Sequence, residues 1–378
     1  MTALRVLVVN AGSSSIKFQV VDTDTGRAIA QGARERVGVE GRTHAEAVKE
    51  AIAEVDGTGV EAVGHRVVHG GDLFTDAVLI DADVEASIRT CIPLAPLHNP
   101  HHLAGIQTAR DLLPDLPHVA VFDTVFHANL PAWARTYAID PKVAAEHHVR
   151  RFGFHGNSHA FVAQCAAAFL GQPLKGLRLV TCHLGNGASA CAVQGGRSVE
   201  TSMGMTPLEG LVMGTRSGDL DPGAVLQLVR RLGVEEVESI LNRRGGLAAV
   251  SGLGNDMRDI EAKAFEGDAR ATLALAIFAH RVRKYIGAYA AVMGGMDAVV
   301  LTGGVGENSV LMRARILANF AYLGLTIESE ANAGATPSTE CPVIDISKAE
   351  SPVRALVVAT NEELMIARET VRVVAGHV

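Results

Sequence analysis

The sequence predicts an α/β protein made of two domains. Apolar runs typical of strands alternate with segments of helical periodicity along the chain. The length of 378 residues, 48% of them hydrophobic, is enough for two domains that each have a core. Two stretches, LRVLVVNAGSSSIKFQV near the start and LRLVTCHLGNGASACAV from Leu177, share one form: apolar strand, polar Asn/Gly/Ser turn, apolar strand. They predict a duplicated fold, with a chance similarity of two hairpins as the competing interpretation.

The first part of the chain predicts a hairpin, one helix and two buried strands. Val6–Val9 and Ile16–Val21 are apolar runs that flank the polar turn of the hairpin. Ala45–Val55 has the apolar spacing of a helix. Ala62–Val68 and His118–Phe122 are short apolar runs, which are typical of strands buried on both faces.

A second block begins near His127 and again alternates strands with helices. The expected strands are Leu177–Leu184, Ala188–Val193 and Asp297–Leu301. The expected helices are Ser158–Leu170 with Asn157 or Ser158 as its cap, Ala269–Met293, and Asn308–Phe320.

Two further helices have strong start signals. Asp221 is a capping residue, Pro222 suits the first helical position, and Gly233 follows the expected end. Near the C-terminus, TNEE matches a capping box, with Thr360 as the cap and Glu363 three residues later. We therefore expect a helix from Pro222 and a last helix from Thr360.

Composition excludes several classes of function. The net charge of −7 and the absence of a long basic run argue against nucleic acid as a partner. The five cysteines form no CxxC pair, so neither a disulfide framework nor a cysteine metal site is expected. The apolar runs are too short for a signal peptide or a membrane span, so we expect a cytoplasmic protein with no membrane partner.

Three glycine-rich turns, each after an expected strand, are candidate phosphate-binding elements. They are NAGSSSIK at Asn10–Lys17, HLGNGAS at His183–Ser189 and GGVGENS at Gly303–Ser309. Glycine lets backbone N–H groups approach phosphate oxygens closely. Neither the Walker nor the dinucleotide fingerprint is present. Any one turn is explained as an ordinary connection, but three in one chain favour phosphate binding.

Two arginines stand among glycines in weakly charged surroundings. Arg66 lies in GHRVVHGG and Arg216 in MGTRSGDLDP. The planar guanidinium suits a carboxylate or a phosphate. The structural alternative for Arg216 is a salt bridge to Asp219 or Asp221.

Other candidate side chains are a histidine pair and two carboxylates. His155 and His159 lie in FGFHGNSH, but without the HExxH glutamate or a nearby cysteine pair a zinc site is disfavoured. Asp123 directly follows the run His118–Phe122, a place where α/β folds carry site residues, although a turn cap is the simpler role. Glu362 is left over by the capping box and would suit a hard cation such as Mg²⁺.

Taken together, these motifs resemble the acetate kinase family of acyl-phosphate-forming kinases. The matching pieces occur in the family's order over nearly the whole chain: VNAGSSSIKF, GHRVVHGG, LAPLHNP, VFDTVFH, FGFHGNSH, HLGNGAS, PLEGLVMGTRSGDLDP, Asp256–Arg258, TGGVGENS and TNEEL. The resemblance implies the fold of the acetate and sugar kinase, Hsp70 and actin superfamily. That fold has two duplicated ribonuclease H-like α/β domains with an active-site cleft between them. The expected domains are 1–124 with the helix about 361–378, and 125–360.

The resemblance also implies roles for particular residues. Asn10 and Glu362 would position Mg²⁺, or Mn²⁺ in its place. Arg66 and Arg216 would bind the acetate carboxylate and the transferring phosphoryl group, which His155 would also contact, and Asp123 would be an essential carboxylate beside them. The acetate methyl pocket would consist of Val68, Leu97, Phe154 and Pro207. ATP or ADP would be bound by Lys17, Ser13, Ser15, His183, Leu184, Gly185, Asn186, Gly187, Asp256, Met257, Arg258, Gly304, Val305, Gly306, Glu307 and Asn308.

The reaction implied by the resemblance is reversible phosphoryl transfer from ATP to acetate, giving ADP and acetyl phosphate. A carboxylate is already a nucleophile at pH 7, so positioning and positive charge matter more than a general base. We therefore expect Asp123 to orient an arginine or a metal-bound water, and the transfer to be direct.

Two rival functions and an oligomeric state complete the expectations. A non-catalytic ATP switch related to Hsp70 would need a substrate-binding domain, for which the chain has no spare length. A propionate or butyrate kinase is the nearer rival, although Val68 narrows the pocket and favours acetate. The family is typically a homodimer formed through the second domain. The apolar helix Ala269–Met293 suits that interface, and burial in the core explains it as well.

Overall fold

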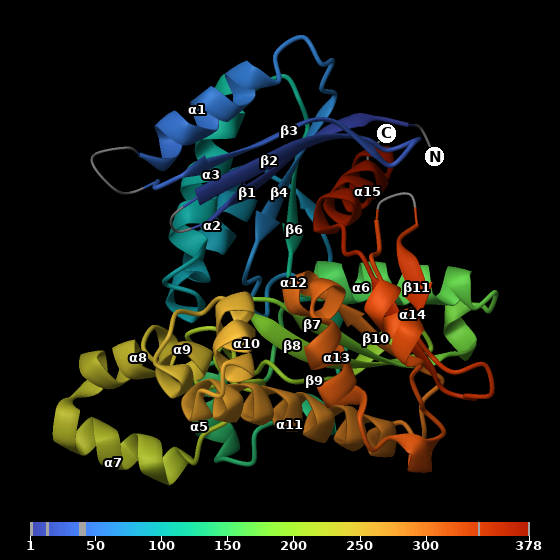
Figure 1. Ribbon diagram of the computed structural model, residues 1–378. Coiled ribbons are helices and arrows are strands. Elements are labelled where there is room, and N and C mark those ends of the chain that lie inside the picture. The colour runs from blue at the N-terminus through green and yellow to red at the C-terminus, as the bar shows by residue number, and fades with distance from the viewer. Residues whose placement is uncertain (1–2, 13–14, 38–42, 339–340, 377–378) are drawn as a thin grey trace. The chain divides into compact units, whose positions relative to one another are not determined.

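The computed structural model describes residues 3–12, 15–37, 43–338 and 341–376, so Ser13 of the first glycine-rich turn lies outside the described residues. The chain divides into two compact units (Figure 1). Unit 1 consists of Met1–Ala128, Gly156–Ser158 and Asn361–Val378, and unit 2 of Asn129–His155 and His159–Thr360.

Unit 1 contains a six-stranded sheet in the order β3-β2-β1-β4-β6-β5. β1, β2 and β3 are antiparallel neighbours, β1, β4 and β6 run parallel, and β5 returns antiparallel to β6. β3 was not expected from the sequence, because its residues RAIAQGARE contain few large apolar side chains and none of them is fully buried. The strands are β1 Arg5–Ala11, β2 Ser15–Asp22, β3 Arg27–Glu35, β4 Ala62–Val67, β5 Val78–Leu79 and β6 His118–Phe122.

Unit 2 contains a second six-stranded sheet in the order β11-β12-β10-β7-β8-β9. β7, β8 and β9 are antiparallel neighbours, β7, β10 and β12 run parallel, and β11 returns antiparallel to β12. The two sheets thus share one topology strand for strand, so the repeat in the sequence is a duplicated fold and the expected fold class is confirmed. The strands are β7 Arg178–Leu184, β8 Ala188–Gln194, β9 Arg197–Thr201, β10 Ala298–Thr302, β11 Val343–Asp345 and β12 Arg354–Val358.

Helices cover both faces of the sheet in unit 1 (Figure 1). α1 (His44–Glu54) and α3 (Asn99–Leu112) pack on one face, and α2 (Ala82–Thr90) lies beside α3. The C-terminal helix α15 (Glu362–Ala375) packs on β1, β4 and β6. It approaches β4 closely at Gly64, where a Cβ atom would lie 2.5 Å from Thr370 Oγ1. The final segment of the chain is therefore part of the first unit's core.

In unit 2, the long helix α11 (Ala269–Val292) packs on β7 and β8, with nine of its residues buried. α6 (Gly156–Phe169) spans the boundary of the units, since Gly156–Ser158 group with unit 1. The remaining helices are α4 Ala132–Arg135, α5 Pro141–Glu146, α7 Pro222–Leu232, α8 Val234–Asn242, α9 Gly246–Ser251, α10 Met257–Phe265, α12 Gly303–Asn308, α13 Val310–Leu317 and α14 Ser329–Gly334. Among the described residues, no helix is both long and apolar enough to cross a membrane.

Three helix starts differ from the sequence-based expectation. α6 begins at Gly156 after His155, which has a left-handed φ of 56°, so neither Asn157 nor Ser158 is the cap. α15 is capped by Asn361, whose side chain accepts from the Leu364 N–H, so Thr360 and Glu363 do not form the capping box. Asn308 ends the short helix α12, and the next helix is capped by Ser309. The neighbouring residue supplies the side-chain cap of α15 and of α13, whereas α6 begins without a side-chain cap.

Candidate active site

Unit 1 contains an ion pair between Arg66 and Asp123. Arg66 lies near the carboxyl end of β4, and Asp123 directly follows the parallel strand β6. Arg66 Nε donates to Asp123 Oδ1 at 2.9 Å and Nη2 donates to Oδ2 at 2.7 Å. Both oxygens of the carboxylate are thus used by one guanidinium, in the bidentate geometry that fixes the orientation of arginine.

The backbone around Asp123 holds this carboxylate still. Its N–H donates to Val67 O at 2.9 Å, and its carbonyl accepts from Gly156 N at 2.9 Å. A Cβ atom on Gly156 would lie 2.3 Å from that carbonyl, so the glycine is required for the close approach. Asn157 Nδ2 lies 3.4 Å from Asp123 Oδ1. The Asp123 side chain is 3% exposed, and its carboxylate serves Arg66 rather than capping a turn.

Glu362, the first residue of α15, belongs to the same group of charges. Burial raises the pKa of Glu362 and the Asp123 carboxylate adds to the rise, whereas Arg66 and Lys17 oppose it. Burial acts to lower the pKa of Arg66, but Asp123 and Glu362 raise it above its ordinary value. The guanidinium therefore stays charged, whereas burial disfavours the negative charge on Glu362.

Asn10 and Glu362, both in unit 1, carry the types of oxygen donor that suit Mg²⁺. Asn10 is the next-to-last residue of β1, opposite Lys17 in the hairpin, and α15 packs on β1. Amide and carboxylate oxygens are hard donors, and Mg²⁺ commonly takes one or two carboxylates together with water and substrate phosphates. In the described ranges, no three His, Cys, Asp or Glu side chains gather as metal ligands.

In unit 2, four polar side chains from three elements form a hydrogen-bonded chain. His155 Nδ1 lies 2.9 Å from Ser189 Oγ, and the same oxygen lies 2.8 Å from His159 Nε2. His159 Nδ1 in turn lies 2.8 Å from Thr181 Oγ1. His183 stacks on His155 with ring centroids 4.4 Å apart. The buried serine therefore fixes the plane of the His155 ring, and neither His155 nor His159 belongs to a group of three potential metal ligands in the described chain.

Arg216 differs from Arg66 because it has no carboxylate partner among the described residues. Its Nη1 donates to Pro207 O at 3.1 Å and lies 3.6 Å from Met213 Sδ. Asp219, one alternative partner, instead accepts from Tyr285 Oη and from Gly210 N. Burial, with no opposing carboxylate, lowers the pKa of Arg216. The salt-bridge alternative is thus not formed.

Arg216 and His155 lie close to the same turn. A Cβ atom placed on Gly187 would lie 3.4 Å from His155 Nε2 and 3.7 Å from Arg216 Nη1. The structure therefore brings these two sequence-predicted residues together beside the β7–β8 turn. Of the expected methyl-pocket residues, Phe154 is buried and Pro207 half-buried in unit 2, while Val68 is buried and Leu97 half-buried in unit 1.

A cavity of about 690 Å³ lies in unit 2, a size typical of small-molecule sites. It opens between the β7–β8 turn, the start of α10 and α12. Arg258 donates to Asp256 through its side chain and backbone and holds the pKa of that carboxyl at about 2. Eight of the residues expected to bind ATP line this cavity: Gly185, Asn186, Asp256, Met257, Arg258, Gly304, Val305 and Asn308.

The remaining expected ATP residues lie elsewhere. Glu307 has an internal role: its Oε1 accepts from Thr302 Oγ1, Gly303 N and Thr360 N and so holds the turn after β10. Others do not line this cavity: Lys17 and Ser15 belong to unit 1, and His183, Leu184, Gly187 and Gly306 belong to unit 2.

Comparisons with known proteins identify the family of this chain. A model of the acetokinase family matches residues 5–56 and 42–368. The chain belongs to the acetokinase family. It is 49% identical to an acetate kinase of Clavibacter michiganensis subsp. michiganensis, covering 98% of this chain and 99% of that protein. Among solved structures, it is similar to Porphyromonas gingivalis acetate kinase, with TM-score 0.92, 39% identity and coverage of 98% and 99%. A propionate kinase from Francisella tularensis subsp. tularensis SCHU S4 gives TM-score 0.91, 39% identity and coverage of 98% and 100%.

Membership of the acetokinase family makes the protein a phosphotransferase with a carboxylate acceptor. The lining of the unit 2 cavity also contains residues that sequence reasoning missed. Asn255 donates to Asn186 Oδ1 at 2.8 Å and adjoins the recognised Asp256, and Gly214 lies in the motif of Arg216, so both were within reach of the motifs. Leu247, Glu261 and Ser309 also line the cavity but stand in segments with no distinctive pattern.

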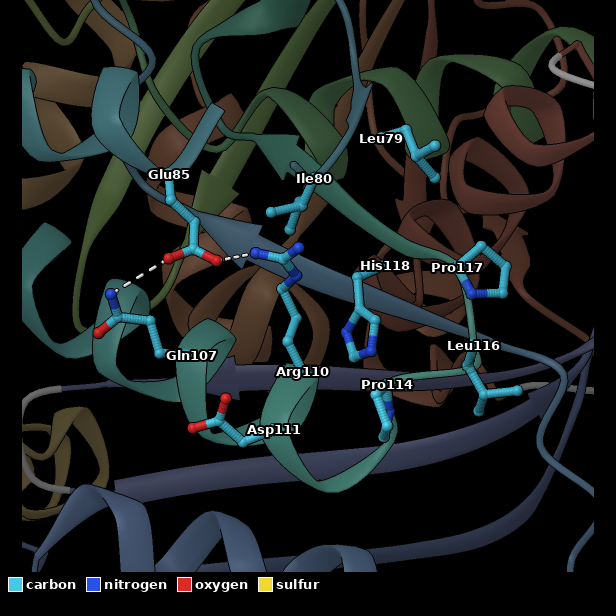
Figure 2. A pocket seen from close by; sticks show the side chains of 10 residues that line it. All are labelled: Leu79, Ile80, Glu85, Gln107, Arg110, Asp111, Pro114, Leu116, Pro117 and His118. Atoms are coloured by element: carbon cyan, nitrogen blue, oxygen red, sulfur yellow. Dashed lines mark hydrogen bonds and ion pairs between the residues drawn. The ribbon is translucent and has the colours of Figure 1, made fainter. Parts of the chain in front are cut away.

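A second cavity, of about 610 Å³, lies in unit 1 near the amino end of β6, whereas Asp123 follows the carboxyl end of that strand. Figure 2 shows Arg110 and Gln107 both directed at the carboxylate of Glu85, to which they donate. These polar groups satisfy one another, and no residue expected for the acetokinase reaction lines this cavity.

Proposed function

We propose that this protein catalyses the reversible transfer of the γ-phosphoryl group of ATP to acetate, with Mg²⁺, or Mn²⁺ in its place. A carboxylate oxygen of acetate attacks the γ-phosphorus in line, the bond to the β-phosphate oxygen breaks, and ADP leaves with the electron pair. The products are acetyl phosphate and ADP. The observation that carries this proposal is Arg216, a half-buried cation next to His155 and without a carboxylate partner among the described residues.

Positive charge on Arg216 suits the phosphoryl oxygens, over which negative charge spreads in a loose transition state. His155 is held by Ser189 through Nδ1, and we propose that its Nε2 donates to one of the same oxygens. Such donors are already oriented before the reaction begins, because the surrounding protein fixes them, so no reorganisation is needed to reach the transition state.

Arg66 is proposed to bind the acetate carboxylate, with Asp123 as its orienting partner. Both Asp123 oxygens accept from Arg66, so the carboxylate is used in holding the guanidinium. Acetate is ionised at neutral pH and needs no base. We therefore propose an orienting role for Asp123 and not proton transfer.

The metal would be held by Asn10 and Glu362 together with water and the nucleotide phosphates. When bound, Mg²⁺ neutralises negative charge on the β- and γ-phosphates. The raised pKa of Glu362 supports this assignment, since burial leaves its negative charge poorly compensated until a cation arrives. The adenosine part of ATP is proposed to occupy the unit 2 cavity.

Hydroxamate formation tests the proposed function. Acetate, MgATP and hydroxylamine should give acetyl hydroxamate with the wild-type protein. Arg216→Ala and His155→Ala should each lower turnover by roughly 10²–10³-fold, as the loss of one transition-state donor does elsewhere. If no short carboxylate gives hydroxamate, the kinase proposal fails. Near-normal turnover in either variant would remove that residue from the mechanism.

Propionate is the alternative acceptor, because one similar solved structure is described as a propionate kinase. Val68 is buried, so we propose that it narrows the methyl pocket and makes acetate the better substrate. One methylene changes the transition-state free energy by only about 1–3 kcal/mol. The ratio of kcat/KM values for acetate, propionate and butyrate decides between the two.

We further propose a cytoplasmic homodimer formed through unit 2. The apolar side of α11 is already used in the core, where Phe278, Val282 and Ile286 are buried. α7, in contrast, buries none of its residues and leaves Leu226 54% and Leu232 48% exposed. We therefore place the interface at α7. Leu226→Glu should convert the dimer to a monomer in light scattering, and an unchanged mass would reject this interface.

A further inference from the structure

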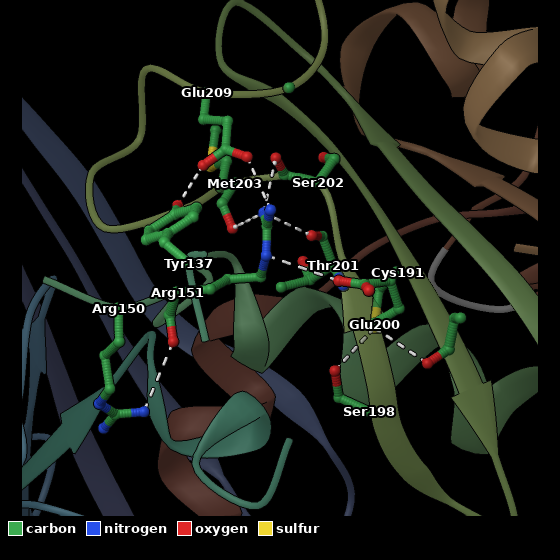
Figure 3. A network of polar contacts seen from close by, with 12 residues as sticks. Tyr137, Arg150, Arg151, Cys191, Ser198, Glu200, Thr201, Ser202, Met203 and Glu209 are labelled. Carbon is green, nitrogen blue, oxygen red and sulfur yellow. Dashed lines mark hydrogen bonds and ion pairs between the residues drawn. The ribbon is translucent and has the colours of Figure 1, made fainter. Parts of the chain in front are cut away.

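The loop between β9 and α7 carries two residues of the proposed reaction, Pro207 and Arg216. Over the range 202–218 it contains no helix or strand. Its shape must therefore come from side chains that bind its backbone. Figure 3 shows the group of residues that does this, with Arg151 at its centre.

Arg151 binds the beginning of the loop through backbone carbonyls. Its Nη1 lies within hydrogen-bond distance of the carbonyl oxygens of Thr201, Ser202 and Met203, at 2.9, 3.3 and 3.1 Å. Its Nη2 donates at 2.6 Å to Oε1 of Glu209, two residues after Pro207. One guanidinium thus joins both sides of the segment that contains Pro207.

Tyr137 completes this connection. Its hydroxyl donates to Glu209 Oε2 and accepts from Met205 N at 3.2 Å. Gly204 passes directly beside the pair: a Cβ atom there would lie 1.8 Å from Glu209 Oε2 and 2.1 Å from Tyr137 Oη. Any larger residue at this position would therefore displace Glu209 or Tyr137.

The two residues after Arg151 link the loop to the segment that contains His155. Phe152 N and Gly153 N, which follow Arg151 directly, both donate to Gly204 O at 3.0 and 3.2 Å. His155 is only two residues beyond Gly153. At the other end, Arg216 Nη1 donates to Pro207 O at 3.1 Å. A shift of the loop at Glu209 would therefore move Pro207 and, through it, Arg216.

We propose that Arg151, Glu209 and Tyr137 are positioning residues that hold the 202–218 loop in its reactive shape. They keep Arg216 directed at the phosphoryl group and Pro207 against the acetate methyl group. This inference rests on the proposed function for the roles of Arg216 and Pro207. The geometry of the loop itself is independent of that function.

The charges agree with such a role. Burial acts to lower the pKa of Arg151, but Glu209 and the other acidic neighbours raise it above its ordinary value. Burial and the bond to Glu209 raise the pKa of Tyr137, so it remains a neutral donor. The Arg151 side chain is 15% exposed, and its partner Glu209 is held from two sides. Arg151 has a second, longer carboxylate contact, from its Nε to Glu200 Oε1 at 3.5 Å, but Glu200 lies before the loop and does not join it to Tyr137.

Glu209→Gln is the most specific test of this proposal, because it keeps the size of the side chain and removes its charge. Asp345→Asn is a matched control: Arg354 donates to Asp345 and to the carbonyls of Lys348 and Ser351, in the same unit but outside the loop. The two variants should lose comparable stability in urea. Only Glu209→Gln should lower kcat, by roughly 10–100-fold, as small displacements of reacting groups do.

Two readouts distinguish positioning from general weakening. Glu209→Gln should reduce the preference for acetate over propionate while leaving the KM for ATP within about twofold, because Pro207 moves, whereas Gly214 is the one residue of the 202–218 loop in the lining of the cavity. Backbone amides of 202–218 should exchange hydrogen faster in Glu209→Gln than in Asp345→Asn. Unchanged kcat and substrate preference, or equal exchange of this loop in both variants, would overturn the inference.

The exchange measurement does not depend on catalysis. A wild-type protein that forms no acetyl phosphate would therefore reject the proposed function, while the loop-positioning inference would still be decided by exchange. Tyr137→Phe, which removes only the hydroxyl, should give the same pattern in weaker form. A Tyr137→Phe variant with wild-type exchange and kcat would remove Tyr137 from the positioning group.

Discussion

A double-mutant cycle on Arg66 and Asp123 can decide what Asp123 does. The perturbations are Asp123→Asn, Arg66→Gln and the two together. Asp123 accepts two charge-assisted hydrogen bonds from Arg66, at 2.9 and 2.7 Å. If Asp123 acts only by orienting Arg66, removing it matters no further once Arg66 is gone. If it also transfers a proton, the two losses accumulate.

The expected magnitudes separate these outcomes. Removal of the Arg66 donor should lower turnover by roughly 10²–10³-fold. Asp123→Asn leaves the guanidinium in place without its fixed orientation and should cost about 10²-fold. Independent roles would multiply to at least about 10⁴-fold, whereas the orienting role predicts a double variant no slower than Arg66→Gln alone.

Hydroxamate formation can be used to measure the turnover of the wild type, the two single variants and the double variant, because the product accumulates over long incubations. Breaking a buried ion pair by removing one partner costs about 3–5 kcal/mol of stability, so the folded fraction must be measured in parallel by circular dichroism. Asp76→Asn breaks the exposed Arg372–Asp76 pair of the same unit and should leave turnover unchanged. A double variant about tenfold or more slower than Arg66→Gln would refute the orienting role.

Three further predictions follow from burial and close packing. Burial raises the pKa of Glu362, so the ionised Glu362 side chain opposes folding above its unfolded pKa. Glu362→Gln should therefore raise the melting temperature near pH 7 and abolish Mg²⁺-dependent turnover. The gain in melting temperature should disappear as the pH falls through the unfolded pKa of about 4.3. Equal melting temperatures of Glu362→Gln and the wild type at pH 7 would contradict this prediction. Gly304 lines the cavity proposed for ATP, and a Cβ atom on it would meet no protein atom within 4 Å. Gly304→Ala should therefore raise the KM for ATP without loss of stability. The control Gly334→Ala, where a Cβ atom also meets no atom, should change neither the KM nor the stability. His65 and His118 are hydrogen-bonded at 2.9 Å, and burial lowers the pKa of both, so the unfolded chain binds more protons than the folded one. The free energy of unfolding should therefore fall by about 1.4 kcal/mol per pH unit per histidine below roughly pH 6.5. Urea unfolding at pH 7.5 and 5.5 measures this fall, and a His118→Asn variant with the same pH dependence as the wild type would contradict the prediction.

Much of the fold could be predicted from residue patterns. The hairpin of β1 and β2, the start of α7 at Pro222 and the length of α11 were all confirmed, because each depends on local signals: alternation, a capping Asp, or a long amphipathic run. β3 was missed because its partly exposed residues leave no apolar pattern. The start of α6 was wrong because His155 adopts a left-handed conformation that only its surroundings stabilise.

The candidate site divides in the same way. Arg66, His155 and Arg216 were recognisable in motifs that contain glycine, and Asp123 by its place directly after an apolar strand. Their partners were not, since Asp123 and Arg66 are 57 positions apart and meet only because β4 and β6 are parallel neighbours. Ser189 looks like any serine in a turn, yet its hydroxyl joins His155 to His159.

Local patterns were enough to predict an α/β protein with a duplicated form and the motifs of an acyl-phosphate-forming kinase, because periodicity, caps and glycine turns act over a few residues. Which arginine is neutralised by a carboxylate depends on long-range folding. Arg66 is paired, whereas Asp219 is bound by Tyr285 and leaves Arg216 without a carboxylate in the described chain. Such partnerships depend on strand order and on loops closed over long separations, and no local pattern specifies them.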